Sequence, residues 1–357
     1  MRKIELKLES RNYQILIGSG LLGQACNLLE EVGFSGKLVI ITNPIVQGLY
    51  GRALKQSLLT EGFKVTVLLV ADGEEQKSLE TAGRLYGELT ESYAERTTPI
   101  LALGGGVIGD LAGFVAATYL RGVPLVQMPT TLLAQVDSSI GGKVAVNHGK
   151  LKNKIGAFYQ PRLVISDTAT LKTLPAKEFA NGMAEVIKSA VIKDSEFFAF
   201  IETNLDKIKK LDDAALEEVV FHSAGVKADV VAQDELDTGP RNILNFGHTV
   251  GHAIETVSDF EIGHGQAIAL GMMAAARIAQ RMGLFDNGEL ARLKDVIDGA
   301  GLPVAMPRLD TAKIIQAIKH DKKVVAGKVR FVLPRAIGNV FITDEVSLSM
   351  VKEVLAA

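Results

Sequence analysis

Residues 100–110 read ILALGGGVIGD, an apolar run that leads through a glycine-rich turn into a predicted helix. The turn from Gly104 to Asp110 fits the G-x-G-x-x-G pattern, in the strand–turn–helix setting where that pattern binds a dinucleotide. Glycines let the backbone approach a pyrophosphate, and the helix N-terminus adds partial positive charge. Unlike a common Rossmann turn, this one does not follow the first strand, and no acidic residue comes about 20 positions later. A glycine turn without a ligand therefore stays an alternative.

Other short apolar runs surround this turn in the first half of the chain. Strands are predicted at residues 1–8, 38–42, 65–70, 100–103 and 125–128. The last four are β-branched or leucine-rich without strict alternation, as in strands that are covered on both faces. Helices are expected between them, for example at 78–94 and 111–119. This alternation predicts an α/β domain over residues 1–174, with a parallel sheet and ligands at the carboxyl ends of its strands.

The pattern changes after Leu174-Pro175, where helical segments dominate. Helices are predicted at residues 177–193, 195–210, 213–233, 249–257, 266–282, 287–299 and 311–320. Strand character returns only at 329–333 and 340–342. We expect a mainly α-helical second domain over residues 175–357, with a ligand cleft between the two domains.

The composition narrows the class of partner. The 39 basic and 41 acidic residues of this 357-residue chain give a net charge of -2, which argues against nucleic-acid binding. The single cysteine, Cys26, cannot form an internal disulfide, as is usual in a reducing cytosol. The N-terminal segment lacks the apolar core of a secretion signal, and no apolar run is long enough to span a bilayer. We expect a soluble cytoplasmic protein without a membrane partner.

Three of the six histidines lie close together in the sequence. His248 and His252 share one helix face, so both rings can reach one metal ion, and His264 stands between two glycines. Glu185 lies in an apolar helical stretch, where a carboxylate needs a metal or a partner such as Lys188. A catalytic zinc takes three such ligands. Hydrogen-bonded helix histidines are the alternative. The remaining histidines are isolated and are expected to be structural or exposed: His148, His222 and His320.

A basic stretch follows the predicted strand at 125–128. The turn from Asp137 to Lys143 is rich in small residues, and Lys150, Lys152, Asn153 and Lys154 come soon after it. Such a cluster is commonly a solvated loop. Beside the glycine turn, however, its ammonium groups could hold an anionic substrate group.

Together these motifs resemble the 3-dehydroquinate synthases, carbon–oxygen lyases of the sugar-phosphate cyclase superfamily. The resemblance rests on the glycine turn and on residues 137–143, 185–188 and 241–252, and it extends from residues 42–44 to 321–323 and 331–334. It implies an N-terminal α/β domain that binds NAD and a mainly α-helical C-terminal domain that binds zinc or cobalt.

The resemblance also implies a reaction in the shikimate pathway, which leads to aromatic amino acids. The substrate, 3-deoxy-D-arabino-heptulosonate 7-phosphate, becomes 3-dehydroquinate and phosphate. The steps are transient oxidation by NAD, elimination of phosphate, re-reduction, ring opening and intramolecular aldol closure. In the family the departing phosphate takes up much of the proton, so no dedicated strong base is expected.

Residue roles follow from the same resemblance. The metal ligands are Glu185, His248 and His264, so that His252 faces the substrate instead. The catalytic and substrate-binding residues are Asp137, Lys188, Lys227, Arg241, Asn245 and His252. The substrate phosphate is bound by Arg121, Lys143 and Asn153, with Arg121 contributed across a homodimer interface. The NAD-binding residues are Asn43, Asp72, Gly73, Glu74, Glu75, Gln76, Lys77, Gly106, Val107, Ile108, Gly109, Asp110, Thr130, Thr131, Lys143, Lys152, Thr170, Leu171, Lys172 and Thr173.

The chain departs from the family pattern at two positions. Leu236 stands where a basic residue is expected, and Ser189 where an aromatic residue is expected. Neither is a predicted ligand, so both affect packing more than chemistry. Related cyclases, such as 2-deoxy-scyllo-inosose or valiolone-type synthases, stay alternatives, as do a metal-dependent polyol dehydrogenase and a non-enzymatic NAD-binding protein. The sequence does not distinguish Lys322 from Lys323 as a site residue.

Overall fold

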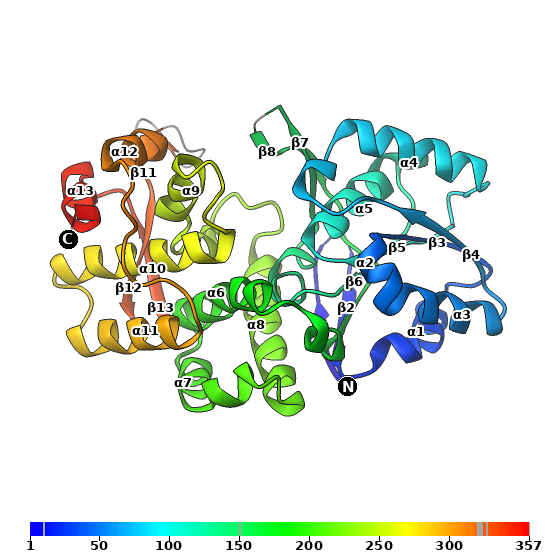
Figure 1. The fold of residues 1–357 in the computed structure, drawn as a ribbon, viewed down its shortest axis with the longest axis horizontal. Coiled ribbons are helices and arrows are strands. Elements are labelled where there is room, and N and C mark those ends of the chain that lie inside the picture. Colours follow the sequence, from blue (N-terminus) through cyan, green and yellow to red (C-terminus); the bar gives the residue numbers. More distant parts are fainter. Residues whose placement is uncertain (10, 150, 320–323, 326–327, 357) are drawn as a thin grey trace. The chain divides into compact units, whose positions relative to one another are not determined.

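The computed structural model describes residues 1–9, 11–149, 151–319, 324–325 and 328–356 (Figure 1). The chain forms two compact units. Residues 1–174 and 216–236 make up the first unit, and residues 175–215 and 237–357 the second. Lys150, His320, Lys322 and Lys323, which the sequence analysis considered, lie outside the described residues.

The first unit is built on a seven-stranded sheet with the order β1-β2-β9-β6-β5-β3-β4. Its strands are β1 (Arg2–Leu6), β2 (Tyr13–Gly18), β3 (Lys37–Thr42), β4 (Lys64–Leu69), β5 (Ile100–Gly104), β6 (Leu125–Pro129) and β9 (Leu163–Asp167). Neighbouring strands are parallel, except that β1 is antiparallel to β2. The predicted parallel sheet is confirmed, and β2 and β9 are strands that the sequence analysis did not identify.

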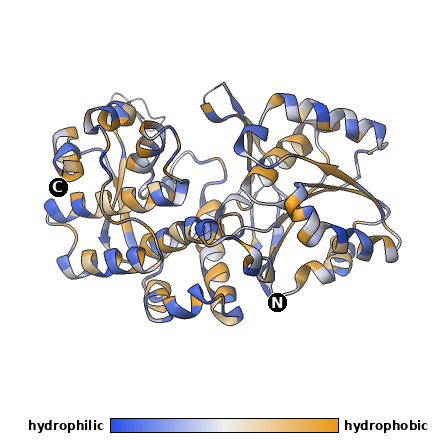
Figure 2. Ribbon diagram, viewed as in Figure 1, coloured by the Kyte–Doolittle hydropathy of each residue, from blue (hydrophilic) through white to orange (hydrophobic). Residues whose placement is uncertain are grey.

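Helices cover both faces of this sheet (Figure 1). In β3, Leu38 and Ile40 join the core that also holds apolar residues of α1 (Ala25–Glu31) and α3 (Arg52–Thr60). Val39 and Ile41 point to the opposite face and join the core formed with α4 (Leu79–Glu91) and α5 (Gly106–Thr118). Successive side chains of a strand point to opposite faces, so a strand covered on both faces is apolar throughout. The buried central strands β3 and β5 are accordingly orange in Figure 2.

The predicted helices of this unit are present with shifted bounds. The helix expected at 78–94 is α4, and the helix expected at 111–119 begins earlier, at Gly106. The basic stretch is an antiparallel hairpin of β7 (Lys143–His148) and β8 (Leu151–Phe158), although the sequence suggested a loop. Shorter turns of helix are η1 (Leu21–Gln24), α2 (Pro44–Val46), η2 (Gln47–Gly51), η3 (Glu74–Gln76), η4 (Tyr119–Arg121), η5 (Ala134–Ser138) and η6 (Thr168–Thr173).

The second unit is mainly helical, as predicted. Its helices are α6 (Ala176–Lys193), α7 (Ser195–Lys209), η7 (Pro240–Asn245), α9 (His248–Val257), α10 (His264–Arg281), α11 (Asn287–Gly299), α12 (Thr311–Lys319) and α13 (Leu348–Ala356). Antiparallel pairs are formed by β10 (Val324–Val325) with β11 (Lys328–Val329) and by β12 (Phe331–Ala336) with β13 (Asn339–Thr343). The apolar helix α10 packs against α6, α9 and α11 and forms the centre of this unit. None of the described helices combines the length and the apolar character needed to cross a bilayer.

Most of the helix α8 (Asp213–Gln233) packs with the first unit, although it lies in the chain between two segments of the second unit. Its residues from 216 onward belong to the first unit, although the sequence analysis grouped them with the second half of the chain. Polar contacts hold α8 there: Glu218 pairs with Arg2 at 2.6 Å, and Lys227 pairs with Asp137 at 2.7 Å. These contacts join residues that are far apart in sequence, so local helix periodicity could not reveal them.

Candidate functional site

The predicted cofactor residues of the first unit follow five neighbouring strands of the sheet. Asn43 follows β3, Asp72 comes after β4, Gly106 begins α5 after β5, Thr130 follows β6, and Thr170 lies in η6 after β9. Because these strands are adjacent and parallel, their carboxyl ends share one edge of the sheet. The chain also reverses its direction across the sheet at β3, which lies between β4 and β5. Ligands of open α/β sheets bind at such a switch point.

The glycine turn has the strand–turn–helix geometry that the sequence predicts. Gly105 lies between β5 and α5, and a Cβ atom on it would stand 3.0 Å from Cγ2 of Thr131. A Cβ atom on Gly109 would stand 2.9 Å from Oε1 of Gln127. All residues of α5 are described. No side chain caps the N-terminus of this helix, and its first turn holds no acidic residue. The first N–H groups of α5 therefore fit an anionic ligand such as a pyrophosphate.

Lys77 connects three segments of the first unit. Its buried Nζ donates to Oδ2 of Asp110 at 2.8 Å and to Oδ1 of Asn153 at 2.5 Å. Burial raises the pKa of the Asp110 carboxyl, and the Lys77 ammonium opposes that rise. Asn147, which the sequence analysis missed, accepts a hydrogen bond from the backbone N–H of Asn153 and donates to Glu74. This network fixes the loop after β4 against α5 and the β7–β8 hairpin.

Two predicted substrate residues of the first unit meet directly. The Lys227 ammonium, on α8, donates to Oδ1 of Asp137 at 2.7 Å and to its carbonyl oxygen at 2.6 Å. Arg121 is exposed and has a positive φ of 66°, next to Leu120 with a φ of 49°. No hydrogen bond or ion pair joins Arg121 to another predicted site residue in the described part of the chain. Lys143 and Lys152 are exposed on the β7–β8 hairpin.

The second unit gathers the residues that could hold a metal. Glu185 lies on α6, while His248 and His264 are the first residues of α9 and α10. Each histidine Nε2 lies 3.7 Å from Oε1 of Glu185, and one ligand atom from each residue lies within 4.8 Å of the others. A separation of 3.7 Å is too long for a hydrogen bond. It is close to the spacing of about 3.4 Å between ligand atoms that each stand about 2.1 Å from a tetrahedral zinc.

His252 takes a different place in this cluster. Its ring centroid lies 5.1 Å from that of His248 and 6.2 Å from that of His264. Among the described residues it belongs to a second possible ligand group, with Glu255 and His264, and not to the group around Glu185. The spacing in the sequence suggested that His248 and His252 bind one metal ion together. Their rings are close in space, but the candidate ligand group around Glu185 contains His248 and His264.

The second ring nitrogen of each candidate ligand is already engaged. Nδ1 of His248 lies 3.1 Å from the carbonyl oxygen of Phe246, and Nδ1 of His264 lies 3.3 Å from Oε2 of Glu255. When Nδ1 donates its proton in this way, Nε2 keeps a lone pair for a metal. Glu255 was not predicted from the sequence, although it is an acidic residue on a buried, apolar helix face, the same signal that indicated Glu185.

Electrostatics keep Glu185 charged despite its burial. Its side chain is 1% exposed and pairs with the equally buried Lys188. Burial would raise the pKa of Glu185, but Lys188 and then His264 outweigh this effect and lower it. For His264, burial would lower the pKa, but Glu185 and Glu255 outweigh it and raise it. Lys188, predicted as a catalytic residue, is thus also the partner of the Glu185 carboxylate.

Glycines allow the three helices to bring these side chains together. A Cβ atom on Gly265 would lie 2.4 Å from the Cα atom of Asn181 on α6, and one on Gly271 would lie 1.9 Å from the carbonyl oxygen of Gly247. Gly247 itself precedes α9 with a φ of 79°, a conformation that favours glycine. The backbone of α10 therefore touches α6 and the start of α9 directly, which places His264 beside Glu185 and His248.

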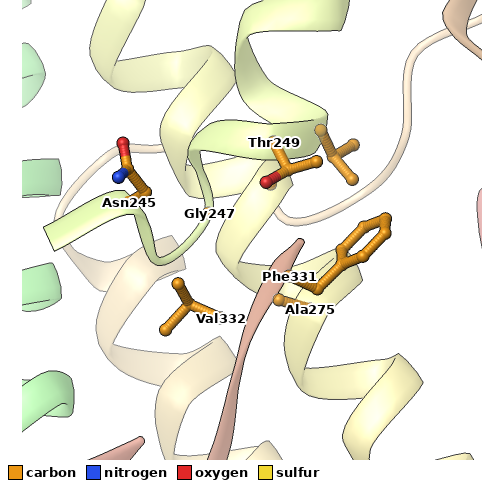
Figure 3. Close-up of a pocket in the computed structure, with 8 residues that line it drawn as sticks. Asn245, Gly247, Thr249, Ala275, Phe331 and Val332 are labelled. Carbon is orange, nitrogen blue, oxygen red and sulfur yellow. The ribbon is translucent and has the colours of Figure 1, made fainter. Parts of the chain in front are cut away.

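A small pocket adjoins the first turn of α9 (Figure 3). It is lined by Asn245, Gly247, Thr249, Val250, Gly271, Ala275, Phe331 and Val332. Asn245 is the predicted substrate residue among them, and its amide donates to Oδ1 of Asn242 at 3.4 Å. Arg241, which lies in the same η7 segment, is 2% exposed.

The fold is that of the sugar-phosphate cyclases. A 2-epi-5-epi-valiolone synthase from Streptomyces hygroscopicus, solved with NAD+ and Zn2+ bound, matches with a TM-score of 0.91 and 27% identity over 98% of this chain and 97% of that chain. A 2-deoxy-scyllo-inosose synthase, solved with carbaglucose-6-phosphate, NAD+ and Co2+, matches with a TM-score of 0.91 and 28% identity over 99% of both chains.

Sequence comparison places the chain within this class. Residues 67–181 match the family model for the 3-dehydroquinate synthase N-terminal region, and residues 182–324 match that for its C-terminal region. The 3-dehydroquinate synthase of Dehalococcoides mccartyi is 52% identical over 346 residues, which cover 97% of this chain and 96% of that protein. The chain belongs to the 3-dehydroquinate synthase family.

The close approach of α10 to α9 gives a first prediction. Gly271→Ala should destabilise the second unit by about 3 kcal/mol, because the added methyl group meets backbone that cannot move aside cheaply. Gly87→Ala is the matched control, since Gly87 lies on α4 and, among the described residues, no atom beyond its own stretch of helix lies within 4 Å of its Cβ position. The control should stabilise by about 0.5–1 kcal/mol. Urea unfolding followed by circular dichroism measures both, and equal stability of the two variants would contradict the packing argument.

The ligand geometry gives a second prediction. Glu185→Gln and His264→Ala should each weaken zinc binding by more than about 100-fold, since losing a ligand costs more than losing one of its hydrogen-bond partners. His148→Ala, which removes an exposed histidine on β7, should bind zinc like the unchanged protein. Zinc retained after dialysis is measured by elemental analysis. Near-normal zinc in both ligand variants would rule out this site.

Proposed function

We infer that this protein is a 3-dehydroquinate synthase that converts 3-deoxy-D-arabino-heptulosonate 7-phosphate to 3-dehydroquinate and phosphate. The observation that carries this proposal is the group of Glu185, His248 and His264, within a chain that is 52% identical to a 3-dehydroquinate synthase. We assign NAD and one divalent metal, zinc or cobalt, as its cofactors. The structures of related cyclases with NAD+ and Zn2+ or Co2+ support this assignment.

We assign NAD binding to the carboxyl edge of the first unit. The uncapped N-terminus of α5, whose first residue is Gly106, would hold the pyrophosphate. The segments after β3, β4, β6 and β9 would hold the rest of the cofactor, and Lys152 on β8 would also contact it. A hydrogen bond from the Asn43 amide to Asp72 at 2.9 Å supports this role, because it joins the loops that follow β3 and β4.

We assign the metal to Glu185, His248 and His264. When bound, NAD would accept and return one hydride, and the metal would polarise the substrate oxygen as a Lewis acid. Residues of the chain would orient the metal ligands: the Phe246 carbonyl holds the His248 ring, and Lys188 holds the Glu185 carboxylate. His252, beside the two candidate ligand rings, would contact the substrate.

The substrate contacts are assigned by charge and residue type. In the second unit, the Arg241 guanidinium would make a two-pronged contact with the substrate carboxylate, supported by the Asn245 amide. In the first unit, Asp137 and Lys227 would bind hydroxyl groups. The exposed Lys143 and Asn153 would hold the phosphate until it leaves, and the departing phosphate would accept the proton, so no strong base is assigned.

A homodimer, a cytoplasmic location and a cleft between the two domains stay predictions of the sequence. Arg121 is the residue assigned to contact the substrate phosphate across the dimer interface. Its exposed side chain and the left-handed backbone of Leu120 and Arg121 support this assignment, because a bulky residue adopts such a conformation only where the surroundings hold it.

One incubation tests the proposed function. The zinc-loaded protein is mixed with the heptulosonate phosphate and a catalytic amount of NAD, and phosphate release and NADH absorbance are followed together. Phosphate release in many turnovers without accumulation of NADH is expected, since each hydride returns to the substrate. Steady growth of NADH without phosphate would instead indicate a polyol dehydrogenase. Absence of both signals would direct the assay to the substrates of the related cyclases.

Arg241 gives a third prediction. Arg241→Lys keeps the charge but loses the two-pronged contact, so the KM for the heptulosonate phosphate should rise about 10-fold or more while the Kd for NAD stays unchanged. Steady-state kinetics measure the first quantity and NAD titration the second. Equal losses in both would contradict a specific role in substrate binding.

A further inference from the structure

Glu255 lies in the last turn of α9 and is 7% exposed. Its carbonyl oxygen accepts hydrogen bonds from the backbone N–H of Phe260 at 2.9 Å and from Oγ of Ser258 at 3.1 Å, which fix the turn that leads toward α10. Its carboxylate points to α10, where Oε2 lies 3.3 Å from Nδ1 of His264. A buried carboxylate is costly unless a specific partner compensates for its lost hydration, and His264 is such a partner.

The His264 ring therefore lies between two carboxylates on two different helices. Its Nδ1 faces Glu255 on α9, and its Nε2 faces Oε1 of Glu185 on α6 at 3.7 Å. The two nitrogens are on opposite sides of the imidazole, so a ring held at Nδ1 has its Nε2 lone pair directed at the Glu185 side. A carboxylate acceptor also makes the ring a more basic ligand than a carbonyl acceptor does.

We propose that Glu255 is a positioning residue for the metal, which fixes the tautomer and orientation of His264 without binding the ion itself. This inference rests on the proposed metal site of Glu185, His248 and His264. The two histidine ligands differ in how they are held. The backbone carbonyl of Phe246 orients His248, whereas His264 depends on a side chain. A substitution of Glu255 thus tests the orientation of one ligand while leaving the other unchanged.

A competing arrangement makes Glu255 a direct ligand. Glu255, His252 and His264 also form a group whose ligand atoms lie within 4.8 Å of one another. In that arrangement Nδ1 of His264 would bind a second ion and could not donate to Glu255. The two arrangements predict different zinc stoichiometry, one ion per chain for a positioning role and two for a shared second site.

The experiment compares metal binding by the full chain and three variants. Glu255→Gln keeps the size of the side chain and an oxygen acceptor but removes the charge, and Glu255→Ala removes the acceptor. Glu261→Gln is the matched control, because it removes one negative charge from an exposed residue in the turn before α10. Zinc Kd and stoichiometry are measured by competition with a chromophoric chelator, and the d–d absorption of the cobalt-loaded proteins is recorded. Circular dichroism of the metal-free proteins reports folding.

We expect one zinc per chain, with the Kd raised about 10–100-fold in Glu255→Gln and at least as much in Glu255→Ala. The cobalt spectrum should change in both variants, while Glu261→Gln should match the unchanged protein. A Kd within twofold of the unchanged protein in both Glu255 variants would overturn the positioning role while the metal site stands. Two zinc ions that fall to one in Glu255→Ala would also overturn it, in favour of a direct ligand. Failure of the unchanged protein to bind zinc would overturn the metal site itself, and this inference with it.

Discussion

Direct contact between helix backbones is the constraint on which the candidate metal site depends. Gly265 and Gly271 leave α10 without a side chain at its contacts with Asn181 on α6 and with Gly247 before α9. The first residues of α9 and α10 consequently reach the middle of α6, where Glu185 lies. Larger residues would separate the helices by the width of a methyl group or more. The ligand atoms, now within 4.8 Å of one another, would then lie too far apart for one ion.

Charge complements this packing. A glutamate that is 1% exposed is unfavourable in isolation, and here the Lys188 ammonium and the two imidazoles compensate for its lost hydration. The same principle applies in the first unit, where buried Lys77 pairs with Asp110 and Lys227 pairs with Asp137. The predicted functional residues are therefore also structural partners of one another. Both ligand affinity and folding stability should be measured for substitutions at these positions, because removing one partner leaves a buried charge without compensation.

The two units differ in how closely the sequence predicts their candidate sites. In the first unit, Asn43, Asp72, Gly105 and Thr130 all follow apolar strands, and parallel strands bring their carboxyl ends to one edge. Identifying the strands was therefore enough to group these residues. The strands β2 and β9 were missed although turn residues flank them, Gly18-Ser19-Gly20 at the end of β2 and Pro161 before β9. The β7–β8 hairpin was hidden by its many lysines and exposed residues.

In the second unit, the sequence by itself determined the helices, because their apolar residues repeat with the helical period. It also determined that His248 and His252 share a helix face, and resemblance to a family pointed to Glu185 and His264. The resemblance predicted Glu185, His248 and His264 as one ligand set. Only the tertiary structure decided how closely their ligand atoms approach, that Glu255 lies beside His264, and that α8 packs with the first unit. The physical reason is that periodicity reports which face of a helix is buried. Which helices meet, and at which residues, depends on backbone approach at a few glycines and on ion pairs between distant segments.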